Sequence, residues 1–197
     1  MNQTYPFHPI DQVLSVMKSF DRPWFVSGGW ALDLSVGRVT REHGDLDLTI
    51  FREDTERLIQ YFDGWTAYVA IPGERRYEIF RELEDVRPPR HELVFQKGDL
   101  KLEFLLIDRD GDKVLFRRSP VITLDIQCFA QQDGSGRPHV APEWQLLFKA
   151  KNPRPKDEQD FANHFKRLGK TSREWLLNAL KRYQPDSHWI ALLESDE

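Results

Sequence analysis

The spacing of hydrophobic positions changes along the chain, and these changes predict a mixture of helices and strands. Apolar side chains recur at helical spacing over residues 9–20 and again over 53–63. Between such segments lie short β-prone runs, each bounded by turn residues. We therefore expect helices at residues 9–20, 30–36 and 53–63, and strands at 24–26, 45–50, 65–71, 92–95, 101–107 and 113–117.

The last third of the chain is predicted to be helical. Residues 132–138 are rich in Gly, Ser and Pro and are the best candidate for a linker. Beyond them apolar residues keep a helical spacing, and residues 171–174 (Thr-Ser-Arg-Glu) have the pattern of a capping box ahead of Trp175. We predict an α+β domain at residues 1–138, followed by a small helical subdomain at 139–197.

Composition narrows the class of protein. The 197 residues are 40% hydrophobic, and the charged residues, 30% of the total, mix both signs to a net charge of −4. This balance excludes a disordered acidic chain and weighs against nucleic acid as a partner, because phosphate neutralisation needs a basic excess. Cys128 is the single cysteine, which favours a reducing compartment. No apolar run approaches the ~18 residues of a membrane span, and the first residues lack a secretory signal pattern. We therefore expect a cytoplasmic protein.

The first candidate for chemistry is the segment Ser27-Gly28-Gly29, between a predicted strand and a predicted helix. Adjacent glycines let a ligand come close to the backbone, and a helix start offers unpaired N–H groups and the positive end of the helix dipole. These properties suit a triphosphate. For an isolated Gly-Gly pair, the alternative is a tight turn.

Carboxylates supply the second and third candidates. Asp45 and Asp47 are spaced so that both project from the same face of a strand, an arrangement whose repulsion Mg²⁺ would relieve. Glu103 lies within the apolar run 102–107, where a carboxylate needs a cation, a metal or hydrogen-bond donors. The alternatives are a solvent-exposed strand face for the aspartates and an arginine partner for Glu103.

Together these features resemble the DNA polymerase β-like nucleotidyltransferase superfamily, and in particular its aminoglycoside and lincosamide nucleotidyltransferase branch. Residues 28–33, 37–41 and 43–48 carry the resemblance almost residue for residue. Residues 142–151 and 156–161 resemble the helical C-terminal part of related members, whereas residues 55–100 match loosely.

The resemblance implies a mixed, twisted sheet flanked by helices and a Mg²⁺-dependent reaction. A nucleoside monophosphate, expected to be AMP from ATP, would pass to a hydroxyl of a small molecule such as an aminoglycoside or lincosamide antibiotic, releasing pyrophosphate. Asp45 and Asp47 would hold Mg²⁺. Glu103, where the family usually carries Asp, would complete the metal site or deprotonate the acceptor hydroxyl.

The resemblance also implies that Ser27, Gly28 and Gly29 cradle the β- and γ-phosphates. Arg41 and Lys149 are further candidates for nucleotide contact, although Arg41 could instead brace its loop and Lys149 could belong to a solvated helix face. Two alternatives to the leading function stay open: the same chemistry on a protein or tRNA acceptor, and a non-catalytic nucleotide-binding module. The oligomeric state is open.

Overall fold

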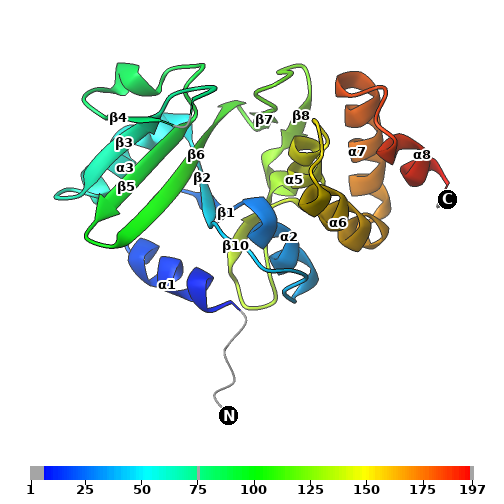
Figure 1. Ribbon diagram of the computed structural model, residues 1–197, viewed down its shortest axis with the longest axis horizontal. Coiled ribbons are helices and arrows are strands. Elements are labelled where there is room, and N and C mark those ends of the chain that lie inside the picture. Colours follow the sequence, from blue (N-terminus) through cyan, green and yellow to red (C-terminus); the bar gives the residue numbers. More distant parts are fainter. Residues whose placement is uncertain (1–6, 75, 196–197) are drawn as a thin grey trace, which may run out of the picture.

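A mixed β-sheet forms the centre of the protein, whose computed structural model describes residues 7–74 and 76–195. Its parallel pairs are β2 with β6 and β1 with β10, and its other neighbouring pairs are antiparallel (Figure 1). Two further strands, β7 (Lys113–Leu115) and β8 (Thr123–Asp125), continue from β6. The order across the sheet is β4 (Tyr77–Ile79), β3 (Thr66–Ala70), β5 (Glu92–Lys97), β6 (Leu100–Asp110), β2 (Asp47–Phe51), β1 (Trp24–Val26), β10 (Pro138–Val140) and β9 (Ala130–Gln132).

Helices lie on both sides of this sheet, and those of the C-terminal part gather at one side of the molecule (Figure 1). The three helices predicted in the N-terminal half are confirmed to within a few residues. The predicted α+β fold is also confirmed. The helices are α1 (His8–Met17), α2 (Gly28–Val36), α3 (Thr55–Tyr61), α4 (Ile126–Phe129), α5 (Pro142–Lys149), α6 (Pro155–His164), α7 (Lys170–Tyr183) and α8 (Trp189–Glu194).

The alternation of side chains along β2 separates a core from a polar face. Leu48 and Ile50 are fully buried in a cluster that also contains residues of α1, α3 and the neighbouring strands. Asp47 and Thr49 point to the opposite face, because successive residues of a strand alternate. The hydrophobic pattern of the sequence therefore fixes which face of the sheet carries the carboxylates.

A second core joins the sheet to the C-terminal helices. It contains Phe25 of β1, Phe51 of β2 and Ile107 of β6, together with buried residues of α5, α6, α7 and α8. Edge-to-face packing of aromatic rings, such as Phe129 on Trp144 at 5.3 Å, fills its centre. The division into residues 1–138 and 139–197 stays a prediction, but this core extends across it.

The predicted linker is wrong. Residues 133–137 form the turn between β9 and β10, and Asp133 closes that turn by accepting hydrogen bonds from the backbone N–H groups of Ser135 and Arg137. β10 then pairs in parallel with β1. The predicted capping box is also wrong, because α7 begins at Lys170 and the Ser172 hydroxyl instead bonds Glu143.

Candidate active site

The polar face of β2 opens into a cavity of about 550 Å³. The sheet supplies its floor, and α2, α5 and the segment around α6 supply its walls. Seven of the eight residues predicted for the site line it, and they come from segments far apart in the sequence: Ser27, Gly28, Gly29, Arg41, Asp45, Asp47 and Lys149. The eighth, Glu103, lies outside the lining.

Gly28 packs against the carboxylate of Asp47, whereas Gly29 packs against the side chains of Arg41 and His43. Gly28 has φ +67°, a conformation that favours glycine, and a Cβ built on it would lie 2.6 Å from Asp47 Oδ2. The backbone N–H of Ser27 donates to the backbone oxygen of Asp47 at 2.9 Å, which fixes the start of α2 against the start of β2. The Asp47 carboxylate therefore lies directly against the N-terminus of α2.

Ser27 has an unused donor at this point. Its side chain does not cap α2, and its hydroxyl oxygen is buried without a hydrogen-bond partner among the residues that the structure describes. The first N–H groups of any helix also lack partners within the helix. A phosphate oxygen at the start of α2 would satisfy both sets of donors.

Burial and neighbouring negative charges both raise the pKa of Asp47. Burial, followed by the charges of Asp45, Glu103 and Glu92, raises the pKa of Asp47 from 3.8 to about 6. No group of three or more His, Cys, Asp or Glu side chains within the described ranges is already arranged around one point as a metal site. Hard carboxylate oxygens that repel one another are nevertheless the donors that Mg²⁺ takes, so the residues fit this ion.

Glu103 occupies the position across the ladder from Asp47. The two residues are Cα partners in the parallel pairing of β2 with β6, so their side chains share one face of the sheet. In this structure the Glu103 carboxylate pairs with Lys101. The predicted third carboxylate is thus beside the aspartates but turned toward a lysine.

Arg41 and Lys149 share a buried carboxylate. Asp160 of α6 accepts hydrogen bonds from Arg41 Nε and Nη2 at 2.7 and 2.9 Å, and Lys149 Nζ lies 2.8 Å from Asp160 Oδ2. Lys149 also donates to Asp157, which Arg154 contacts in turn. Although burial opposes it, hydrogen bonding from Arg41 and Lys149 lowers the pKa of Asp160. Both predicted cations therefore line the cavity as members of an ion-pair network.

A second buried carboxylate braces the loop between α2 and β2. Asp33 accepts hydrogen bonds from the backbone N–H and hydroxyl of Thr40 and lies 2.5 Å from His43 Nε2. The imidazole of His43 packs on the indole of Trp30, with ring centroids 4.4 Å apart. His43 thus positions the loop that precedes the carboxylates.

Sequence reasoning missed several side chains of the cavity. Arg117, Arg118, Arg154 and Lys156 line it as well, together with Glu92 and Lys151. Arg117 follows β7, a strand far from the predicted motifs, and packs on the ring of Phe148 at 5.3 Å. Its sequence position carried no signal, whereas residues 154–157 lie inside or next to a segment that resembled the family. These cations make part of the cavity wall positive, alongside its carboxylates.

Comparison with known proteins matches most of the chain to one protein family. Residues 9–163 match the model of the family described as aminoglycoside-2''-adenylyltransferase. A 2''-aminoglycoside nucleotidyltransferase of Klebsiella pneumoniae is 38% identical over 79 residues, which are 39% of this chain and 42% of that protein. One of Escherichia coli is 36% identical over 70 residues, or 36% of this chain and 28% of the relative. The alignments thus span less than half of either relative.

Solved structures agree on the fold. ANT(2")-Ia in complex with adenylyl-2"-tobramycin has a TM-score of 0.58 at 19% identity, covering 91% of this chain and 99% of the other. The lincomycin-bound lincosamide antibiotic adenylyltransferase LnuA has a TM-score of 0.54 at 18% identity, covering 79% and 94%. The fold and superfamily expected from the sequence are confirmed. Within the described part of the chain, no helix has the length and apolar character that crossing a bilayer requires.

Proposed function

Since the chain belongs to the aminoglycoside-2''-adenylyltransferase family, we propose that it transfers a nucleoside monophosphate from an NTP to a hydroxyl of a small-molecule acceptor. AMP from ATP is the expected group. The observation that carries the proposal is the contact of the Asp47 carboxylate with Gly28 at the start of α2. It brings the donors for a triphosphate and the ligands for a divalent ion to one point.

Different residues would hold the phosphates and the metal ion. The Ser27 hydroxyl and the N–H groups at the start of α2 would hold the β- and γ-phosphates, with the helix dipole adding a positive potential. Asp45 and Asp47 would hold Mg²⁺, with Glu103 as the third carboxylate beside them. When bound, Mg²⁺ would neutralise negative charge on the triphosphate and on the departing pyrophosphate.

The positive wall of the cavity would orient the nucleotide. Arg41 and Lys149 are fixed by Asp160, so their charges are held in place before the substrate arrives. Preorganised charge of this kind stabilises a transition state without the cost of reorganisation during the reaction. The acceptor hydroxyl would attack the α-phosphorus from the side opposite the leaving pyrophosphate.

For the acceptor, the names of the relatives suggest an aminoglycoside or a lincosamide. The test combines the purified protein, Mg²⁺ and each of the four ribonucleoside triphosphates with tobramycin, with lincomycin or with no acceptor, and measures pyrophosphate. We expect release that requires both an NTP and one of the acceptors. Absence of release from every combination, by a protein shown to bind Mg²⁺ and ATP, would contradict the proposed acceptor class.

A further inference from the structure

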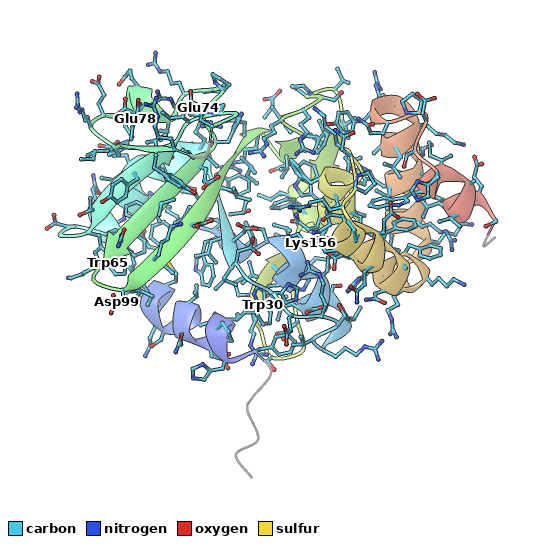
Figure 2. All side chains as sticks on the ribbon, in the orientation of Figure 1. Trp30, Trp65, Glu74, Glu78, Asp99 and Lys156 are labelled. Carbon is cyan, nitrogen blue, oxygen red and sulfur yellow. The ribbon has the colours of Figure 1, made fainter. Side chains whose placement is uncertain are left out.

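A second cavity of about 840 Å³ adjoins the first. Its walls come from the turn between β3 and β4, from Tyr77 of β4, and from Pro89 and His91 ahead of β5. In Figure 2, Glu74, which lines this second cavity, lies at the upper left, and Lys156, which lines the first, lies near the centre of the view. Four residues line both cavities and so mark the junction between them: Glu92, Arg117, Arg118 and Lys151.

Glu92 is the one carboxylate among these four junction residues. Its Cα partner on β6 is Leu105, whose own partner on β2 is Thr49, and both line the first cavity. Glu92 therefore lies on the same face of the sheet as Asp47 and Glu103, displaced by two residues along the strands. After burial and the charges of Asp45 and Glu103, the charge of Glu92 also helps to raise the pKa of Asp47.

Within the described residues, only one of the two oxygens of the Glu92 carboxylate accepts a hydrogen bond. The hydroxyl of Tyr77, itself in the wall of the second cavity, donates to Glu92 Oε1 at 3.1 Å. Over residues 7–74 and 76–195, no hydrogen-bond donor contacts Oε2. Glu103 also accepts a hydrogen bond on one oxygen, from Lys101, but unlike Glu92 it lines neither cavity.

We propose that the second cavity holds the acceptor and that Glu92 takes the proton of its reacting hydroxyl. This inference rests on the proposed function. The hydroxyl oxygen forms a bond to the α-phosphorus, its proton passes to Glu92 Oε2, and the bond from the α-phosphorus to the bridging oxygen breaks, so that its electron pair leaves with pyrophosphate. Of the two roles open to Glu103, the inference assigns it that of a ligand on the metal side.

The surroundings of Glu92 suit a group that gains a proton. Burial raises its pKa, as does the charge of Glu103, whereas the hydrogen bond from Tyr77 and the charges of Lys101 and Arg117 oppose this. Arg117 has no carboxylate partner within the described ranges, and its guanidinium borders both cavities. A positive charge at this junction would attract the negatively charged phosphates of a nucleotide bound in the first cavity.

Three matched Glu→Gln variants test the inference. Glu92→Gln removes the proposed proton acceptor, Glu103→Gln removes the carboxylate beside the metal, and Glu56→Gln changes an exposed residue of α3. Single-turnover rates are measured with ATP, Mg²⁺ and tobramycin or lincomycin, and ATP affinity in the presence of Mg²⁺ is measured by calorimetry. Melting temperatures establish that each variant is folded, and Glu92→Asp, which keeps the charge, provides a second test at the same position.

For Glu92→Gln we expect the chemical step to slow by at least about 100-fold, as for loss of a general base, at any Mg²⁺ concentration and with ATP affinity retained. Glu103→Gln should lose activity at low Mg²⁺ and partly recover at high Mg²⁺, while Glu56→Gln stays at the wild-type rate. Glu92→Asp should be intermediate.

A Glu92→Gln rate within about threefold of wild type would overturn the inference and leave the proposed function intact. A Glu92→Gln variant that only weakens acceptor binding, with its chemical step unchanged, would also overturn it. Wild-type protein that binds Mg²⁺ and ATP but turns over neither acceptor would instead contradict the proposed function, and the inference with it.

Discussion

At the scale of single residues, Asp47 is a proposed metal ligand whose ionised form destabilises the folded protein when no cation is bound. The pKa of the Asp47 carboxyl is about 6 in the folded protein and 3.8 ordinarily. Between these two pH values the folded state therefore binds more protons than the unfolded state does. The free energy of unfolding therefore falls as pH rises through this interval, and the penalty is complete above pH 6. At about 1.4 kcal/mol per pKa unit, it reaches roughly 2–3 kcal/mol without a bound cation.

Asp47→Asn should abolish nucleotidyl transfer and yet stabilise the protein in EDTA. We expect the variant to exceed the wild type by up to about 3 kcal/mol at pH 7.5, with the difference vanishing near pH 4. Mg²⁺ should stabilise the wild type and not the variant. Urea unfolding at both pH values checks this. Retained turnover, or a variant no more stable than wild type at pH 7.5, would contradict the role of this carboxylate.

Gly28 gives a prediction with a close control. Gly28→Ala would place a methyl group 2.6 Å from Asp47 Oδ2, in addition to straining a backbone with φ +67°. Gly64 has φ +76° with nothing within 4 Å of its would-be Cβ, so Gly64→Ala brings the strain alone. Both variants should lose about 1–2 kcal/mol from backbone strain.

Only Gly28→Ala should also lose Mg²⁺-dependent ATP binding. Calorimetric titration with ATP in the presence of Mg²⁺ measures this, and denaturant unfolding measures the shared loss of stability. Equal ATP affinities for the two variants would show that Gly28 serves the turn alone.

At the scale of elements, Asp160 joins α6 to the loop after α2 and to the end of α5. Its side chain is 1% exposed and holds both Arg41 and Lys149. Asp160→Asn would leave two cations close together with one carboxylate fewer, and breaking a buried ion pair in this way costs about 3–5 kcal/mol. We expect a loss of that order in urea unfolding, together with weaker ATP binding as the cavity wall loosens.

The exposed pair of Asp21 and Arg57 supplies the comparison. Both side chains are about half exposed, and Asp21→Asn should change the free energy of unfolding little, because water and salt screen an exposed ion pair. If the two substitutions destabilised the protein equally, the network around Asp160 would have no special part in joining the elements.

Local pattern was enough to predict the elements that carry the site. The strand at 24–26, the following helix and the alternating strand that begins near Asp47 are each determined by neighbouring residues, and the structure has all three. What the sequence did not show depends on partners far along the chain. β10 is three residues long and is stabilised by pairing with β1, so residues 132–138 were predicted to be a linker when they contain a hairpin turn.

The same limit applies to individual side chains. Arg41 and Lys149 line the same cavity as the carboxylates, but their pairing with Asp160, which is 119 residues beyond Arg41, exists only in the folded chain. The exposure of Glu92 to two cavities likewise depends on the register of β5 with β6, which local sequence does not determine. Motifs thus predicted the residues proposed to hold phosphates and metal, and the fold was needed to propose an acceptor side.

At the scale of the whole molecule, two adjoining cavities meet at Glu92, Arg117, Arg118 and Lys151. The C-terminal helices complete the first cavity and share a core with β1, β2 and β6, so both predicted domains contribute to its lining. This lining combines carboxylates of the sheet with cations on α5 and near α6. Such a mixture of charges would suit the polyanionic, metal-bound substrate of the proposed function, despite the overall net charge of −4.

The central claim is that the protein moves a nucleoside monophosphate, and mass spectrometry of the acceptor tests it most directly. The protein is incubated with Mg²⁺, ATP and either tobramycin or lincomycin, with Asp47→Asn as the control. We predict an acceptor that gains the mass of one AMP residue, together with stoichiometric pyrophosphate, and neither product from the variant. An acceptor that gains a single phosphate with release of ADP, or an adduct formed equally by Asp47→Asn, would contradict the claim.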